Sequence, residues 1–156
     1  MALNRGKQFE ERVKKDFLRI SETVVERLPD QVSGYKGSRN VSDFIVYKYP
    51  NLFFVECKST LGNTFPLSNL SQYDELLKRK SIKGVRSGVI LWFIDHDVVC
   101  YVPIATFEQL KRDGKKSVNI KMLNDNEYRI IEIPSKKKRI FLECNFNIMQ
   151  ELQEGD

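Results

Sequence analysis

Asp43, Glu56 and Lys58 are the residues of this sequence whose types and spacing could do chemistry. If Asp43 and Glu56 face each other across paired strands, their Cβ atoms lie about 5 Å apart. Two carboxylates at that separation repel each other unless a cation lies between them. Lys58 projects from the same face of its strand as Glu56. Carboxylate oxygens suit Mg²⁺ or Mn²⁺, which keep several bound waters, so the three residues predict a metal site able to hydrolyse a phosphodiester. An ordinary salt bridge on the sheet surface is the alternative.

A β-hairpin has to position these residues. Residues 43–47 and 52–58 are rich in β-branched and aromatic residues, and the connecting residues 48–51 include a proline and an asparagine, which favour a turn. We expect Tyr47 to pair with Leu52 around this turn. The same register places the aspartate opposite the glutamate.

The first amphipathic segment predicts a helix that carries a third acidic residue. Apolar residues recur at spacings of three and four from Phe9 to Val24, and we expect the helix to end before Pro29. At about 100° per residue, Glu10 lies at the border of the buried face, whereas Glu11 points away from it. Glu10 is therefore able to reach a site on the sheet. Its alternative role is a favourable charge in the first helical turn.

The remaining patterns complete an α/β order of αββαββα in outline. A length of 156 residues is typical of one domain, so we expect a single domain over residues 1–156, with a core at 4–123 and a C-terminal extension at 124–156. The further expected elements are a helix at 68–80 with Ser71 and Asp74 as its N-terminal cap pair, strands at 88–94 and 98–102, a short helix at 106–112, and strand-like segments at 128–133 and 139–142.

The charge balance favours a polyanionic partner. Basic residues outnumber acidic ones by 26 to 21, which gives a net charge of +5. The excess is gathered at residues 78–86, 111–116 and 136–139, and the polar, glycine-bearing segment 31–40 is expected to be a loop suited to contact with backbone phosphates. Solvated turns are the alternative explanation for each basic run.

Composition also excludes several classes of protein. The three cysteines, Cys57, Cys100 and Cys144, are far apart, so we expect reduced, buried thiols and neither a disulfide framework nor a zinc site. No apolar run approaches the roughly 20 residues needed to cross a bilayer, and no secretory leader precedes the first helix, so we expect a cytoplasmic protein that does not bind a membrane. His96 lies between two aspartates in an expected turn, and Trp92 belongs to an apolar run typical of a core.

Taken together, these residues resemble the PD-(D/E)XK nucleases. Asp43 is followed thirteen residues later by Glu56-Cys57-Lys58, although Ser42 stands where the family has a proline. Within that superfamily the chain is similar to the RecU Holliday junction resolvases, although it lacks their long stalk. The motifs that carry this similarity are Asn4-Arg5-Gly6, Ser42-Asp43-Phe44, Glu56-Cys57-Lys58-Ser59 and Phe65-Pro66-Leu67-Ser68-Asn69-Leu70. The glycine four residues before Glu10 is also similar to archaeal Hjc resolvases.

The resemblance implies a PD-(D/E)XK, restriction-endonuclease-like α/β core with a central mixed β-sheet flanked by helices. It implies that Asp43, Glu56 and Glu10 hold Mg²⁺, with Mn²⁺ as a substitute, and that Lys58 assists the attack of water. Gln72 would orient the attacking water, with a solvated helix residue as its alternative role. No small-molecule cofactor is implied.

The function implied is structure-selective resolution of four-way DNA junctions by a homodimer that leaves 5′-phosphate nicks, in DNA recombination and repair of a bacterial or phage-infected cell. The residues expected to contact DNA are Arg5, Lys36, Arg39, Lys78, Arg79 and Lys80. Another endonuclease of the same superfamily, of restriction or repair type, is the first alternative. A non-catalytic DNA-binding module with the same fold is the second.

Overall fold

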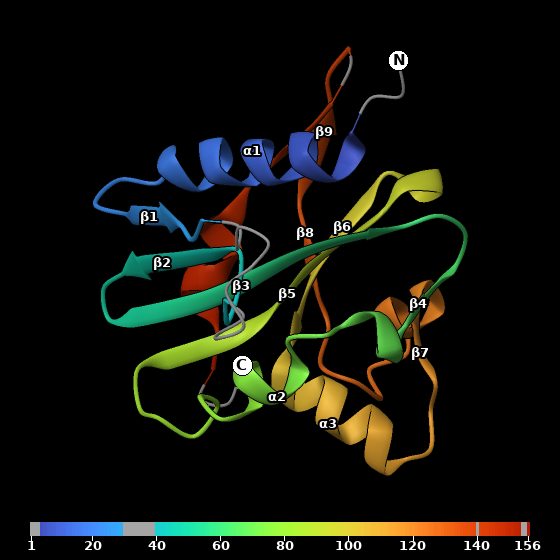
Figure 1. Ribbon diagram of the computed structural model, residues 1–156. Coiled ribbons are helices and arrows are strands. Elements are labelled where there is room, and N and C mark those ends of the chain that lie inside the picture. The colour runs from blue at the N-terminus through green and yellow to red at the C-terminus, as the bar shows by residue number, and fades with distance from the viewer. Residues whose placement is uncertain (1–3, 30–39, 140, 154–155) are drawn as a thin grey trace, which may run out of the picture.

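The centre of the molecule is a six-stranded mixed β-sheet with the strand order β1-β2-β3-β5-β6-β8 (Figure 1). The computed structural model describes residues 4–29, 40–139, 141–153 and 156. Strands β3 and β5 run parallel, and the other neighbouring pairs in this sheet are antiparallel. The strands of the sheet are β1 (Val24–Arg27), β2 (Phe44–Lys48), β3 (Asn51–Thr60), β5 (Val85–Phe93), β6 (Val98–Pro103) and β8 (Ile131–Ile133).

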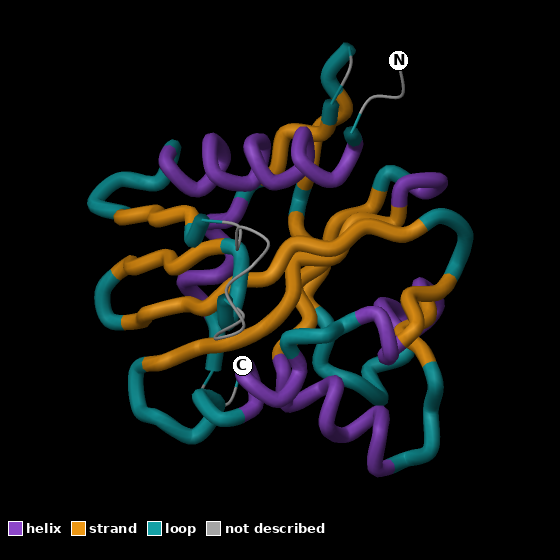
Figure 2. Tube along the Cα trace, viewed as in Figure 1, coloured by secondary structure: helices purple, strands orange, loops and turns teal. Residues whose placement is uncertain are grey.

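Helices lie on both sides of this sheet, and two short antiparallel ribbons are attached to it (Figure 2). The helices are α1 (Arg5–Leu18), α2 (Tyr73–Leu77) and α3 (Ile104–Arg112). The ribbons pair β4 (Thr64–Pro66) with β7 (Ser117–Asn119) and β9 (Ser135–Lys137) with β10 (Leu142–Cys144). Short 3₁₀ segments cover Leu67–Asn69, Ile94–His96, Ile120–Asn124 and Phe146–Glu151. The predicted α/β fold with a central mixed sheet flanked by helices is confirmed.

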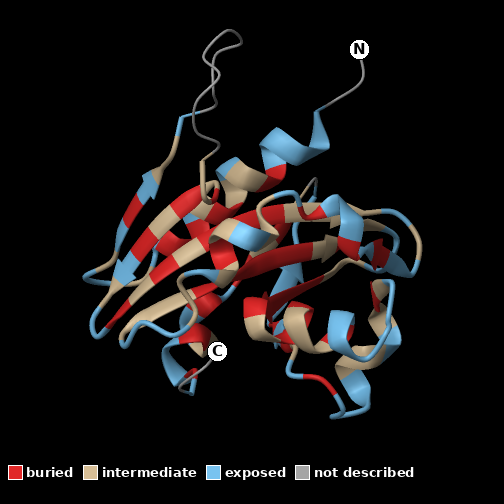
Figure 3. Ribbon diagram, turned by 60° about the horizontal axis from the view of Figure 1, so that its bottom comes forward, coloured by how far each residue is buried: buried red, intermediate tan, exposed pale blue. Residues whose placement is uncertain are grey.

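Each face of the sheet carries its own apolar cluster. Helix α1 and the C-terminal 3₁₀ segment cover one face, where the rings of Phe17 and Phe146 stack with centroids 4.1 Å apart. Helices α2 and α3 pack against the other face over β5 and β6, and Phe65 meets Phe107 edge to face at 6.5 Å. On that second face, β1, β2 and β3 present half-exposed side chains (Figure 3).

Helix α1 is shorter than the sequence predicts. It begins after Asn4, whose side chain accepts a hydrogen bond from the Lys7 N–H at 3.2 Å, and it ends at Leu18 instead of continuing to Val24. Glu22 adopts a left-handed φ of 56°, and the β-branched pair that follows forms β1. The prediction that Val24 belongs to this helix was wrong, because its spacing of four residues from Ile20 fits a helical face only by coincidence. Its side chain is 52% exposed on the sheet edge.

The β2–β3 hairpin has the predicted register. Tyr47 pairs with Leu52, and the ladder continues to Phe44 and Val55. The strands at 88–94 and 98–102 and the helix at 106–112 are also confirmed, as β5, β6 and α3. The turn at His96 is a 3₁₀ segment, as its polar residues indicated.

The predicted helix at 68–80 is interrupted. The chain first makes the 3₁₀ turn at Leu67–Asn69, because Leu67 donates its N–H to the carbonyl of Lys116 at 3.0 Å while its side chain enters the core. Helix α2 begins only at Tyr73, with Gln72 at its N-cap and no side-chain cap, so the predicted Ser71 and Asp74 cap pair is wrong. Tertiary packing overrides the local helical pattern here.

The C-terminal strands are shifted from the predicted positions. Strand β8 lies within the predicted 128–133, whereas β10 (Leu142–Cys144) replaces the predicted 139–142. The shift follows from a turn in which the Lys138 N–H donates to the carbonyl of Phe141 at 2.7 Å. Strand β9 was not predicted, because its three residues are exposed and two of them are lysines. No described helix has the length and apolar character needed to cross a membrane.

A buried carboxylate fastens α1 to the C-terminal ribbon. Asp16 is buried on α1, and its Oδ2 accepts the Cys144 N–H at 2.9 Å. Its Oδ1 lies 3.5 Å from Arg12 and 3.4 Å from Arg19. Burial raises the pKa of Asp16, although the Cys144 N–H and both guanidinium groups oppose the rise. Asp16 therefore sets the position of the helix that carries Glu10.

We expect Asp16→Ala to lower the free energy of unfolding by about 3 kcal/mol, because it leaves the Cys144 N–H without its acceptor and the partly buried Arg12 without its carboxylate. Asp16→Asn keeps an acceptor oxygen and should cost about half as much. Urea unfolding followed by circular dichroism measures both values. Equal losses for the two variants would show that the hydrogen bond to Cys144 contributes nothing.

Candidate active site

The end of the β2–β3 hairpin brings Asp43 to the side of Glu56. The ladder between the strands stops at Phe44, and the Cys57 N–H donates to Asp43 Oδ2 at 2.8 Å. The aspartate side chain thus replaces the next main-chain hydrogen bond of the ladder. This bond fixes the carboxylate of Asp43 against β3, beside the glutamate that precedes Cys57.

Glu56 is a buried carboxyl group with incomplete hydrogen bonding. The residue is 3% exposed, its Oε1 lies 3.8 Å from Lys58 Nζ, and its buried Oε2 has no hydrogen-bond partner among the described residues. Burial, followed by the charge of Asp43 and a hydrogen bond with it, raises the pKa of Glu56 to about 9, although Lys58 opposes the rise. The predicted trio of Asp43, Glu56 and Lys58 is therefore brought together on one sheet face.

Glu10 approaches this centre from α1. Its Oε2 accepts a hydrogen bond from Arg27 Nη2 at 2.9 Å, and Arg27 is the last residue of β1, paired with Phe44. The negative charge of Glu10 also contributes to the raised pKa of Glu56. Glu11, the next residue, is exposed, as the helical spacing predicted.

The donor set of this centre suits a hard divalent cation. Within residues 4–29, 40–139, 141–153 and 156, no cluster of three or more His, Cys, Asp and Glu side chains has metal-binding geometry. The centre therefore offers the two carboxyl groups of Asp43 and Glu56 as ligands, with the carboxylate of Glu10 nearby. The unpartnered Oε2 and the repulsion between the two carboxyl groups are what a bound cation would relieve. Mg²⁺, which is commonly held by one or two carboxylates and several waters, fits this set.

Ser42 accounts for the departure from the family motif. It is buried, and its hydroxyl donates to the carbonyl of Phe44 at 2.8 Å. The bond closes a tight turn directly before β2. A serine thus stabilises the chain where the motif has a proline, and it does so next to Asp43.

Among the described residues, Gln72 and the basic residues at 78–80 have partners other than the carboxylate centre. Gln72 precedes α2 and accepts a hydrogen bond from the Ser71 hydroxyl at 3.0 Å. The basic run at 78–80 is engaged within the chain. Lys78 Nζ lies 2.9 Å and Arg79 Nη1 3.5 Å from the carboxylate of Glu75, and Lys80 pairs with Glu108.

Three other residues were expected to contact DNA. Arg5 is exposed in the first turn of α1, on the same helix as Glu10. Lys36 and Arg39 lie outside the described residues.

Other reactive side chains do not add to the centre. Burial and then the charge of Asp43 raise the pKa of the Cys57 thiol well above its usual value, so it is no nucleophile. All three cysteines are free and buried, as expected. His96 Nε2 lies 2.7 Å from the Asn63 amide oxygen in an exposed turn, away from any described cluster of metal ligands.

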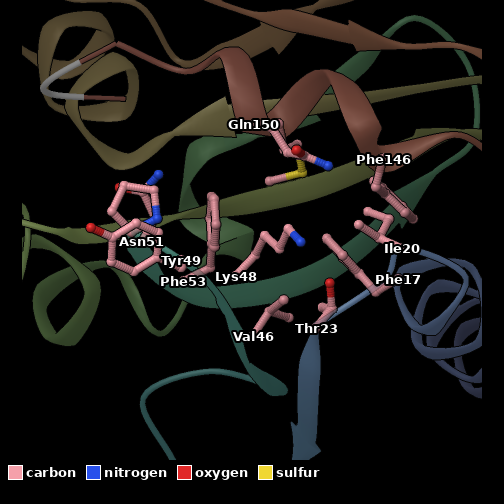
Figure 4. Close-up of a pocket in the computed structure, with 12 residues that line it drawn as sticks. Phe17, Ile20, Thr23, Val46, Lys48, Tyr49, Asn51, Phe53, Phe146 and Gln150 are labelled. Carbon is pink, nitrogen blue, oxygen red and sulfur yellow. The ribbon is translucent and has the colours of Figure 1, made fainter.

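An apolar pocket of about 110 Å³ lies at the opposite end of the hairpin (Figure 4). Its walls include Phe17, Phe53 and Phe146, and the side chain of Lys48 extends into the same region. Lys48 Nζ donates to the carbonyl of Ser21 at 2.5 Å. No residue predicted for catalysis lines this pocket, and its lining supplies no carboxylate for hydrolysis.

Arg27 is the site residue that sequence reasoning missed. The helical pattern was extended through residue 24, so the arginine fell into an unassigned segment before Pro29. The β-branched pair at Val24 and Val25 was the available indication of a strand. If this pair had been assigned to a strand that continues to Arg27, the sequence would have predicted Arg27 next to β2.

Comparison with solved structures finds the same fold in Hjc from Archaeoglobus fulgidus, described as a Holliday junction resolvase from an archaeal hyperthermophile. The TM-score is 0.53 at 17% sequence identity, and the match covers 73% of this chain and 88% of that one. No family model matches the sequence, and no curated protein matches it. The chain therefore has the fold of Hjc, and the predicted fold class, a central mixed sheet flanked by helices, is confirmed.

We expect the carboxyl pair to make stability depend on pH in metal-free buffer. Glu56 titrates near 4.5 in an unfolded chain and near 9 in the fold, so its protonated form favours folding. This stabilisation is complete below pH 4.5 and is lost as the pH rises toward 9. The melting temperature in EDTA should fall over that window, and Glu56→Gln should flatten the fall.

Added Mg²⁺ or Mn²⁺ should raise the melting temperature of the wild-type protein at pH 8, because a cation that binds only the folded state stabilises it. Asp43→Asn should remove most of this increase. An increase of the same size in Asp43→Asn would contradict a metal site at this pair. Calorimetric titration with Mn²⁺ provides a second, direct measurement.

Proposed function

We propose that this protein is a metal-dependent endonuclease that resolves four-way DNA junctions, acting in the cytoplasm in the manner of the RecU and Hjc resolvases. The observation that carries the proposal is the pairing of the buried Glu56 with Asp43, with Lys58 beside them, at the end of two strands in a fold shared with a Holliday junction resolvase. The alternative, an ordinary salt bridge between Glu56 and Lys58 on the sheet surface, does not explain why Asp43 lies against Glu56, a carboxyl group that is only 3% exposed.

In this proposal Asp43 and Glu56 would hold Mg²⁺ or Mn²⁺, and Glu10, whose charge acts on Glu56, would bind the water shell of the ion. The ion supplies a Lewis acid for the scissile phosphate and lowers the pKa of the attacking water. Asp43 is oriented for this task by the Cys57 N–H, and Glu10 by Arg27. Lys58 places an ammonium group next to the reacting phosphate, where it stabilises the negative charge that develops on the phosphoryl oxygens. The strand is cut so that a 5′-phosphate remains.

Two symmetric cuts in a junction require two related active sites, so we propose a homodimer. The exposed Arg5, next to the catalytic helix turn, would contact backbone phosphate. Lys78, Arg79 and Lys80 would have to exchange an intramolecular carboxylate for a phosphate in order to contact DNA.

The test is to incubate the protein and Mg²⁺ with a four-way junction and, separately, with a linear duplex of the same sequence. We expect paired cuts in symmetry-related strands of the junction and little cutting of the duplex. Asp43→Asn should abolish cutting while junction affinity stays equal or rises, because a negative charge facing phosphate is removed. Comparable cutting of both DNAs would favour a general endonuclease of the same superfamily, and full activity in EDTA would rule out the metal mechanism.

A second prediction tests whether Glu10 has a specific catalytic role or acts only through its negative charge. Glu10→Gln should lower the cleavage rate by orders of magnitude, whereas Glu11→Gln should behave nearly as wild type. Both changes remove one charge from the same helical turn, and the glutamine keeps an acceptor for Arg27. Junction cleavage rates under single-turnover conditions give the comparison, and equal rates would show that α1 supplies no catalytic acid.

A further inference from the structure

The second face of β1, β2 and β3 is unusual because its half-exposed residues are apolar. Strands with one solvated face normally present polar side chains there. Here the half-exposed positions are mostly aliphatic or aromatic, and contiguous exposed apolar surface marks a binding site. We call this surface the open sheet face; it consists of Val24, Ile45, Tyr47, Leu52 and Phe54.

The open sheet face is continuous with the carboxylate centre. Strand β2 directs Phe44 and Val46 into the core under α1, so Ile45 and Tyr47 point to the opposite face, and Asp43 lies directly before this strand with its carboxylate on the Cys57 N–H. On β3, Leu52 and Phe54 share that face with Glu56. Tyr47 is four residues from Asp43, which places its row about 13 Å from the carboxylates along the strands.

The area of the open sheet face argues against a protein partner. Two of its five residues, Val24 and Tyr47, are about half exposed and the other three are less exposed, so it offers roughly 300 Å² of apolar surface, since a large aromatic side chain buries 150–250 Å². A stable protein interface needs about 800 Å² from each partner. A stacked nucleobase needs much less, and aromatic rings accept any base because each base has a flat π face.

The groups around the open sheet face fit a nucleic acid strand. The Arg79 guanidinium lies 5.0 Å from the centroid of the Phe54 ring, so a planar cation already stacks on this surface. Lys58 extends from the same face beyond Glu56. Glu26 is the acidic residue that β1 contributes, and it lies at the outer edge of the sheet.

We propose that the open sheet face is a stacking platform for unpaired nucleotides adjacent to the cut, with Tyr47 as its principal contact. The proposal rests on the proposed nuclease function and specifies its substrate as a strand opened at a branch point. Tyr47 is 42% exposed and stands beside Leu52 and Val24 in neighbouring strands, so its ring is held within a row of side chains. In a straight duplex the bases are stacked inside, and extracting one costs a few kcal/mol. The platform would thus favour branched over linear DNA.

The experiment compares Tyr47→Ala with Tyr49→Ala, a matched control. Tyr49 is more exposed, at 80%, but it lines the apolar pocket at the turn and not the open sheet face. Tyr47→Phe keeps an aromatic ring. Fluorescence anisotropy in EDTA measures the affinity for a forked DNA with unpaired arms and for a blunt duplex, and melting temperatures confirm that each variant folds.

We expect Tyr47→Ala to weaken fork binding by about fivefold or more and to leave duplex binding nearly unchanged, because stacking is lost only where bases are unpaired. Tyr47→Phe should bind the fork within about twofold of wild type, and so should Tyr49→Ala. A fluorescent base analogue in the unpaired arm should be quenched by the wild-type protein and not by Tyr47→Ala.

Several results would overturn the platform. Equal effects of Tyr47→Ala on fork and duplex would do so, as would equal fork affinities for Tyr47→Ala and Tyr49→Ala. A change of the oligomeric state of Tyr47→Ala in gel filtration would show that this face joins two copies of the chain. Junction cleavage by the wild-type protein separates the two proposals. If the protein cleaves junctions but Tyr47→Ala binds the fork as wild type does, only the stacking platform is wrong. If Tyr47→Ala weakens fork binding but the wild-type protein does not cleave junctions, only the nuclease function is wrong.

Discussion

The electrostatic repulsion between Asp43 and Glu56 is the constraint on which the arrangement of this molecule depends. The two carboxyl groups lie side by side at the end of the β2–β3 hairpin, and one of them, Glu56, is buried. Such a pair is unfavourable when both groups are charged, so the surrounding structure has to hold it in place. The Cys57 N–H, which binds Asp43, and the ammonium group of Lys58 are the nearest compensating groups. An unfavourable pair that is kept in a rigid frame is typical of a functional site.

The frame is rigid because both layers of the fold are anchored near the hairpin. Helix α1 is packed on β3 through the apolar cluster and is fastened to β10 by the buried Asp16. Because Glu10 lies on the same helix, the bond between Asp16 and the Cys144 N–H indirectly fixes the distance between Glu10 and the sheet. Parallel pairing of β3 with β5 buries the strand that carries Glu56 and Lys58 in the middle of the sheet. Two of the residues proposed for catalysis therefore lie on a strand that is paired on both sides.

The sequence predicted the parts of this site that depend on local spacing. The register of the hairpin follows from alternation and turn residues, and these alone predict that Asp43 lies against Glu56. The helical wheel separated Glu10 from Glu11 for the same reason. The end of α1 was not predictable in this way, because Ile20 and Val24 fit a helical face while the chain turns at Glu22. Non-local hydrogen bonds likewise decided the segment before α2, where Leu67 binds Lys116 across the β4–β7 ribbon. Hydrogen bonds between residues so far apart in the chain cannot be predicted from a short local segment of the sequence.

The charges around the centre also favour a divalent cation and a phosphodiester as joint occupants. Glu10, Asp43 and Glu56 contribute three negative charges when ionised, and the described cations in contact with them, Arg27 and Lys58, contribute two positive ones. The sum for these five residues is one negative charge, which repels a phosphate on its own. A divalent cation reverses the sign to one positive charge, and the single negative charge of a phosphodiester then neutralises it. Since unbalanced charge is costly in a partly buried site, each occupant is retained more strongly when the other is present. In the proposed resolvase, DNA shape would then be selected at the surface beside the centre, where the apolar side chains of β2 and β3 have no charge to balance.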